Sequence, residues 1–342
     1  PKTFKDMVPS ESIKLPPIKR SEFKDTELPE RNSILYEILK LDGKTDDEIK
    51  EIVSTYLALT KFVDDGIGRI VKKLEQLSLI ENTIIVFTAD HGDFAGEHNM
   101  FGKGGVFYDS LVKVPLIVSW KGKFSPQGQI DKSLVNTIDV LPTLLQLTGC
   151  VDFLNPQPVA ADQDMPNPGP VVSSDIVSKW INPEMLRRFQ GMPLPTVTKA
   201  EPRTAAFSEY GTGGQTFSQQ DFKQLSTTTG SAAIFDSLWA RESEGRRKMV
   251  RTSQWKYVTD LHSNKGSERK YASTANYGDE LYDLINDPWE MNNVAFNSKN
   301  IYIISEMRRH LLEWMISTED YNPVPLPNII GRGPKPTINT EN

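Results

Sequence analysis

The stretch TIIVFTADHGDFAGEHNMFGKGGVFYDSLVKVPLIVS, residues 83–119, decides the fold class of this 342-residue chain. It opens with an apolar, β-branched run at 83–88 and closes with another at 114–118, and both runs predict buried strands. The first run stops at Asp90-His91-Gly92. Ligands of open α/β sheets bind beyond the carboxyl ends of strands, so we expect Asp90 and His91 to lie where chemistry is done.

Charged residues recur at several offsets between the two runs, and their pattern resembles the sulfatase family of the alkaline-phosphatase-like superfamily. Several offsets match together, which makes the resemblance specific. Ala89 and Asn99 stand where the family often has Ser and Gly, and neither change removes a charge. The matching segments are Asp90-His91-Gly92, Gly96-Glu97-His98, Gly102-Lys103, Tyr108-Asp109-Ser110-Leu111 and 114–118.

The resemblance implies a role for each charged residue. Asp90 and His91 would help hold a divalent cation, with calcium as the expected ion and magnesium or manganese as alternatives. Lys103 would contact the sulfate group as a compact point charge. His98 is a second catalytic candidate, and a structural hydrogen bond is an equally open interpretation of it. The plain alternatives are a turn cap for Asp90, a loop histidine for His91 and a solvated lysine for Lys103.

The family's nucleophile motif is absent from this sequence. Sulfatases carry Cys/Ser-x-Pro-x-Arg, whose first residue is oxidised to formylglycine, whereas Cys150, the single cysteine, lies in Thr148-Gly149-Cys150-Val151-Asp152. The family's N-terminal aspartate pair also has no match here. We therefore interpret the chain as the later part of a sulfatase or one chain of a cleaved enzyme, inactive alone. One expected partner of this chain is the missing N-terminal part of the enzyme.

The composition also limits the classes of partner that we expect. The net charge of −6 comes from 45 acidic and 39 basic residues without a basic patch, so we expect no nucleic-acid partner. No apolar run reaches the length of a membrane span, and no N-terminal signal peptide is recognisable. The resemblance implies an extracytoplasmic location, either periplasmic, secreted or lysosomal, and a small-molecule or saccharide sulfate ester as substrate.

The segment before the strand run predicts one long helix. Residues 1–32 are polar and proline-punctuated, which is typical of an irregular surface segment. Thr45 with Glu48 forms a capping-box pattern, and apolar residues then recur in steps of three and four from Ile49 to Leu77. We expect this helix to pack on the sheet beside the 83–88 strand. Farther along, Pro142 either breaks a helix near Val140 or sits in a first turn, which the family favours.

The last third changes character. Short alternating runs at 204–210, 247–251, 255–259 and 280–284 predict a small antiparallel sheet, and 301–315 predicts a covering helix. Asp287-Pro288 predicts a turn. The proline-rich stretch 155–170 would be an exposed insertion or a lip over the active-site mouth. We predict an α/β-domain part over 1–200, a small C-terminal α+β subdomain over 201–325 and a tail over 326–342.

The sequence therefore predicts an α/β fold, with the later part of a large mixed sheet flanked by helices and a small C-terminal antiparallel sheet. The expected function is metal-dependent hydrolysis of sulfuric esters by the complete protein. One alternative is a phosphodiester or phosphonate monoester hydrolase of the same superfamily. The other is a catalytically inactive sulfatase-like binding module, which the absent nucleophile motif favours and the set Asp90, His91 and Lys103 disfavours.

Overall fold

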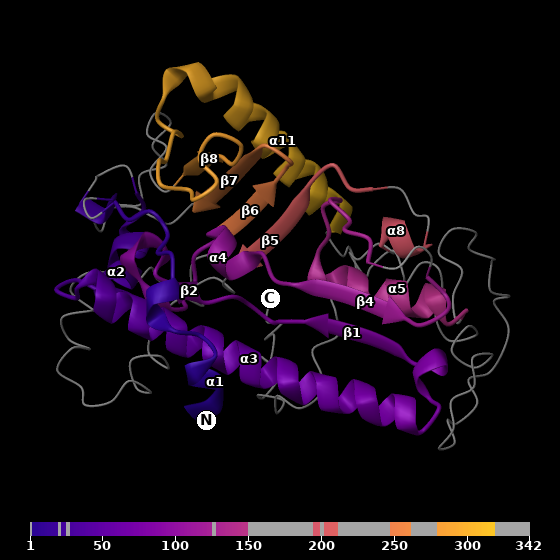
Figure 1. Cartoon of the computed structure of the whole chain (residues 1–342). Helices are drawn as coiled ribbons and strands as arrows, with labels where there is room; N and C mark the ends of the chain where they lie inside the picture. The colour runs from indigo at the N-terminus through magenta and orange to yellow at the C-terminus, as the bar shows by residue number, and fades with distance from the viewer. Residues whose placement is uncertain are drawn as a thin grey trace, which may run out of the picture.

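The computed structural model describes residues 2–19, 22–24, 28–124, 128–149, 194–198, 202–210, 247–260 and 279–318. The stretch 155–170, Cys150 and the predicted tail lie outside these residues. Two regions stand out in Figure 1: a strand pair beside a long helix, and a four-stranded sheet with a helix along it. The fold is α/β with a C-terminal antiparallel sheet, as the sequence predicts.

The first region contains the two predicted strands. β1 (Ile84–Thr88) pairs antiparallel with β4 (Leu116–Trp120). Within the described ranges these two strands have no other strand neighbour. The residues of β1 are half-buried, or exposed at Thr88, although their composition is typical of a buried strand. The two strands are confirmed, but their side chains are less buried than the sequence predicts.

The chain between these strands is the site loop. It forms the hairpin β2 (Phe94–Ala95) and β3 (Phe101–Gly102), and then the short helix α4 (Asp109–Val112). Residues 103–108 belong to no helix or strand. Their conformation must therefore be fixed by contacts outside the regular backbone ladders.

Helix α3 (Asp46–Gln76) begins where the capping pattern predicts. The Thr45 hydroxyl accepts from the Glu48 amide at 3.3 Å, and the Glu48 carboxylate accepts from the Thr45 amide at 2.8 Å. The first turns are buried, with Ile49 and Val53 packed against Leu41. Local capping and this small cluster hold the start of the helix.

The rest of the α3 apolar stripe is not covered. Leu59, Val63 and Ile70 are 55%, 54% and 63% exposed, respectively. In Figure 1 the helix runs alongside β1, yet these side chains bury little surface against it. The prediction that the whole stripe packs on the strand is wrong for this half of the helix.

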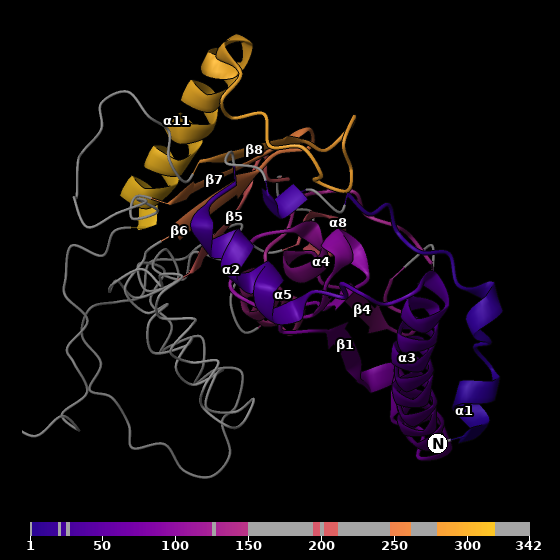
Figure 2. The same ribbon diagram turned by 90° about the vertical axis from the view of Figure 1, so that its left-hand side faces the viewer.

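The C-terminal sheet is confirmed. Its strands pair antiparallel in the order β5-β6-β7-β8. Val250, Tyr257 and Leu281 are 0% exposed and pack against α11 (Ile301–Thr318), which lies along one face of the sheet (Figure 2). Each such side chain contributes about 1.5–3 kcal/mol on burial. The strands are β5 (Ala206–Tyr210), β6 (Arg247–Arg251), β7 (Trp255–Asp260) and β8 (Glu280–Asp283).

Side chains pack across the predicted boundary at residues 200/201. Phe107 of the site loop packs with Met249 and Val258 of the sheet. Tyr108 and Tyr282 belong to another shared cluster, with ring centroids 6.0 Å apart. The domain boundaries stay a prediction, but the site loop is built partly on the C-terminal sheet.

The remaining elements are short. α1 (Lys2–Asp6) and α2 (Glu30–Leu39) correct the prediction of irregular structure over 1–32. The Phe4 ring packs edge-on to Phe62 of α3 at 5.2 Å, a tertiary contact that no local pattern announces. Pro142 lies in the first turn of α5 (Val140–Leu147), as the family pattern favours. The others are α8 (Pro195–Thr198) and 3-10 turns at Ser10–Ser12, Glu22–Lys24, Ile80–Asn82, Glu97–Asn99, Thr137–Asp139 and Ser298–Asn300.

Candidate active site

The end of β1 holds Asp90 and His91 side by side. Asp90 Oδ1 accepts from the His91 backbone N–H at 3.0 Å, and Asp90 Oδ2 lies 3.6 Å from His91 Nε2. His91 Nδ1 lies 2.9 Å from the Gly92 carbonyl oxygen. Because a carbonyl only accepts, we assign the proton to Nδ1, which leaves the Nε2 lone pair free. This is the tautomer in which Nε2 can bind a metal.

Gly92 is required by a close backbone approach. A Cβ at this position would lie 2.0 Å from the Ser110 carbonyl oxygen. The Gly92 amide donates to the Leu111 carbonyl at 2.8 Å. The backbone after β1 is thus tied to α4, whereas the side chains of Asp90 and His91 are 87% and 41% exposed.

The charge state of Asp90 follows from its neighbours. The hydrogen bond from the His91 backbone N–H lowers the pKa of Asp90 most, and the positive charge of the Lys103 ammonium lowers it further. Asp90 is therefore an ionised carboxylate at neutral pH.

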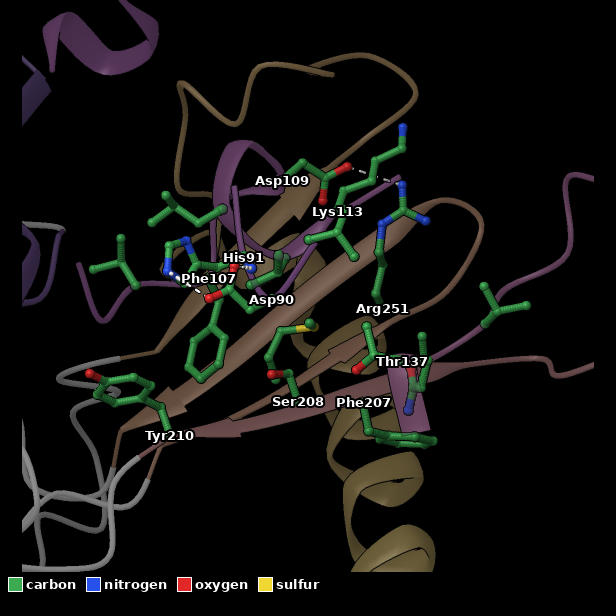
Figure 3. A pocket seen from close by; sticks show the side chains of 18 of the residues that line it. Asp90, His91, Phe107, Asp109, Lys113, Thr137, Phe207, Ser208, Tyr210 and Arg251 are labelled. Carbon is green, nitrogen blue, oxygen red and sulfur yellow. Dashed lines mark hydrogen bonds and ion pairs between the residues drawn. The ribbon is translucent and has the colours of Figure 1, made fainter. Parts of the chain in front are cut away.

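Asp90, His91 and Lys103 line one pocket of about 950 Å³. Within the described part of the chain, the Lys103 ammonium makes no hydrogen bond or ion pair. Figure 3 shows Phe107 and Tyr210 on the same side as His91, and Arg251 with Asp109 across from them. An exposed carboxylate, an imidazole and an unpaired ammonium therefore share one concave surface.

His98 does not join this group. Its side chain is 2% exposed, and Nδ1 pairs with the Glu22 carboxylate at 2.8 Å. The imidazole also stacks on Tyr108, with ring centroids 3.9 Å apart. These contacts support the structural interpretation of His98 over substrate contact.

The C-terminal sheet contributes side chains to the pocket that were not predicted from the sequence. Tyr210 and Arg251 line the pocket from β5 and β6, with more than a hundred residues separating them from Lys103 in sequence. Arg251 donates to Asp109 Oδ2 at 3.3 Å. No local signal marks either residue, because strand alternation predicts a face of the sheet and not its neighbour.

Asp90 and His91 offer one oxygen donor group and one nitrogen donor to the metal that the resemblance implies. A carboxylate and a neutral imidazole with a free Nε2 suit a divalent cation, although calcium usually takes 6–8 oxygen ligands. The described residues contain no group of three or more His, Cys, Asp or Glu side chains that could hold a metal by themselves. Asp90 and His91 thus fit as part of a metal shell whose other ligands lie elsewhere.

Part of the chain matches a known protein family. Residues 5–150 match the family model named Sulfatase. These residues are similar to the sulfatase family. Enzymes of the sulfatase family generally use a divalent metal. No helix among the described residues of the chain has the length and hydropathy to cross a membrane.

Individual relatives agree with this family. The multifunctional alkaline phosphatase superfamily protein PehA of Trinickia caryophylli is 35% identical over 102 residues, covering 30% of this chain and 20% of PehA. Arylsulfatase K of Bos taurus is 26% identical, covering 73% of this chain and 34% of that protein. The chain spans less than half the length of the curated relatives it matches.

A solved structure shows the same fold over nearly the whole chain. The phosphonate monoester hydrolase SpPMH from Silicibacter pomeroyi superposes with a TM-score of 0.64 at 21% identity. The match covers 94% of this chain and 54% of SpPMH. The sulfatase-like residues and the C-terminal sheet thus together correspond to about half of a longer protein of this fold.

Proposed function

We propose that the complete protein is a sulfuric ester hydrolase and that this chain supplies part of its metal shell and one sulfate-binding cation. The observation that carries the proposal is that Asp90, His91 and Lys103 line one pocket beyond the end of β1. A divalent cation, calcium by our expectation, would neutralise the charge of the ester oxygens when bound. Asp90 and His91 would hold it through a carboxylate oxygen and Nε2.

In this proposal, side chains of this chain also bind the sulfate ester directly. Lys103 donates hydrogen bonds from its ammonium group to an ester oxygen, where negative charge grows in the transition state. Phe107 and Tyr210 bound the pocket on the side of His91 and limit the shape of the alcohol part of the substrate. His98 supports the loop through Glu22 and Tyr108 and makes no contact with substrate in this proposal.

We further propose that the missing N-terminal part of the enzyme covers the open region. The exposed apolar stripe of α3 and the edge of β1 that no strand of the described residues pairs with support this assignment. SpPMH provides further support, because this chain corresponds to only 54% of it. By the family resemblance, that part would carry the nucleophile and the remaining metal ligands, and the protein would be extracytoplasmic.

Replacement of Lys103 tests the proposed function. In the complete protein, Lys103→Ala is expected to lower kcat/KM for an aryl sulfate by 2.7–4 kcal/mol, or about 10²–10³-fold. Lys103→Arg should restore little, because a planar fork does not replace a compact ammonium. Lys121→Ala, an exposed lysine 49% accessible at its side chain, is the matched control and should change kcat/KM less than about twofold. Wild-type kcat/KM in Lys103→Ala would contradict the proposal.

Asp90→Asn should give a separable defect. It is expected to weaken metal affinity, measured by titration of metal-free protein, and excess metal should partly restore turnover. This outcome would distinguish a metal ligand from a turn cap, because loss of a cap lowers stability without a metal-dependent rescue.

The alternative activity is hydrolysis of phosphonate monoesters or phosphodiesters, which the name of PehA makes worth measuring. Rates on matched aryl sulfate and aryl phosphonate esters would decide between the two. An inactive binding module would show neither rate while retaining anion binding at Lys103. The 342-residue chain alone should show no turnover, since it lacks the covalent nucleophile of the family. Turnover that persists after repurification and disappears in Asp90→Ala would refute this expectation.

A further inference from the structure

The segment after Lys103 is buried but belongs to no helix or strand. Lys103 and Gly104 are exposed, whereas Gly105, Val106, Phe107 and Tyr108 are buried. The buried carbonyl groups of such a segment need hydrogen-bond donors from elsewhere in the protein. For the Gly105 and Phe107 carbonyls the donors come from the C-terminal sheet, whereas the Tyr108 carbonyl accepts from the backbone of α4.

Arg247 of β6 supplies the first contact. It is 1% exposed, and its guanidinium donates to the Gly105 carbonyl. The same guanidinium lies 5.7 Å from the centre of the Phe107 ring and 5.6 Å from that of Tyr210. Both rings line the pocket that contains Lys103. One buried cation therefore contacts the loop backbone two residues after Lys103 and two of the aromatic side chains that line the pocket, Phe107 and Tyr210.

Lys256 of β7 supplies the second contact. Its side chain is 0% exposed, and Nζ donates to the Phe107 carbonyl at 2.9 Å. Nζ also pairs with the Asp109 carboxylate and lies 2.6 Å from Glu290 Oε1. A buried ammonium is costly unless it is paired, and these two carboxylates satisfy that requirement.

Glu290 contacts both Lys256 and Asp109. Its Oε2 accepts from the Asp109 backbone N–H at 2.5 Å, and its side chain is 2% exposed. Its backbone adopts φ of 58°, an unusual value for a residue other than glycine. The surrounding contacts hold this strained conformation, so the position of the carboxylate is strongly determined.

We propose that Arg247 and Lys256 are positioning residues that fix the loop carrying Lys103 and so aim its ammonium at the bound anion. The inference rests on the proposed role of Lys103. An ammonium on an exposed side chain is effective only if the backbone below it is held, because a misplacement of about 1 Å can cost on the order of 10²-fold in rate. The catalytic loop is thus held by a sheet distant from it in sequence.

Amide hydrogen exchange on the 342-residue chain tests the loop without reference to activity. Arg247→Met should raise the exchange rates of the amides at 104–108 by about tenfold or more, while the β7 amides remain protected. Lys248→Met is the control, since Lys248 neighbours Arg247 on β6 but pairs with Glu209 instead. Unchanged exchange at 104–108 in a folded Arg247→Met protein would overturn the inference. If that variant does not fold, Arg247→Lys, which keeps the charge but not the fork, takes its place with a smaller expected rise.

A double-mutant cycle in the complete protein tests whether the effect passes through Lys103. Arg247→Met should lower kcat for an aryl sulfate by about 10–100-fold with a smaller change in KM. In the Lys103→Ala background the same replacement should cost less than about twofold. Equal losses in both backgrounds would show a general structural role and overturn the inference. If Lys103→Ala alone kept full activity, the proposed function would fail, and hydrogen exchange would still decide whether Arg247 holds the loop.

Discussion

The β1–β4 pair with α3 and the β5–β8 sheet with α11 have similarly apolar sequences but opposite degrees of burial. Val250, Tyr257 and Leu281 in the second region are 0% exposed, whereas Ile70 of α3 is 63% exposed and Ile117 of β4 is 57% exposed. The second region has a covering helix within the described chain, and the first does not. Apolar composition thus shows that an element needs a partner but does not say where that partner lies.

The largest expected effect lies in the closed region. Leu281→Ala should lower the free energy of unfolding by about 2–5 kcal/mol, because it leaves a cavity between the sheet and α11. Urea denaturation of the 342-residue chain, followed by tryptophan fluorescence, measures this change. A loss below about 0.5 kcal/mol would mean that the closed region is no better packed than the open one.

The second prediction uses Glu280, which is 4% exposed and accepts hydrogen bonds from Tyr282 at 2.7 Å and Asn32 at 3.0 Å. Burial raises the pKa of Glu280 from its ordinary value of 4.5 to about 7. The folded protein then holds a proton that the unfolded chain releases. Its contribution is fully present below about pH 4.5 and is lost as the pH rises towards 7, amounting to about 3 kcal/mol.

Glu280→Gln should remove this pH dependence, since the amide does not ionise. Denaturation at pH 5 and pH 7.5 in wild type and variant measures the difference. Glu209→Gln is a suitable control because that carboxylate is 58% exposed at the sheet surface. An unchanged slope in Glu280→Gln would show that another group is responsible.

The third prediction concerns the start of α3 in the open region. Thr45→Ala removes one half of the capping box and should cost about 1 kcal/mol. Because much of α3 lacks tertiary cover, we expect the loss to appear as reduced helicity in far-UV circular dichroism. No change in helicity would indicate that packing, and not the cap, holds the helix.

The smallest expected effect is that of replacing Ile70 on the exposed face of α3, and it tests the contrast between the open and closed regions most directly. Ile70→Ala in the 342-residue chain should change the free energy of unfolding by no more than about 0.5 kcal/mol, since Ile70 is 63% exposed. In the complete protein the same replacement should cost more, because we propose that the N-terminal part covers this face. Equal small costs in both proteins would refute that assignment.

The structure confirms the elements with strong local patterns. The capping box of Thr45, the two strands around Asp90-His91, and the alternating strands of the C-terminal sheet all lie where their residues predict. α1 contradicts the prediction of irregular structure over 1–32, and α2, which starts at Glu30, was not predicted from the sequence. Burial of α3 was predicted wrongly because an apolar stripe records the need for a partner and not its presence.

The sequence by itself determined which groups can act on an anion: an ionisable carboxylate, an imidazole and an ammonium spaced along one loop. Only the tertiary structure decided that His98 is enclosed by Glu22 and Tyr108 and that cations of a distant sheet hold the loop beyond Lys103. The physical reason is that residue type fixes charge and hydrogen-bonding capacity, which are local properties. Burial and pairing depend on elements brought together from distant parts of the chain, 76 residues apart for Glu22 and His98 and 142 for Gly105 and Arg247, and no local pattern encodes that encounter.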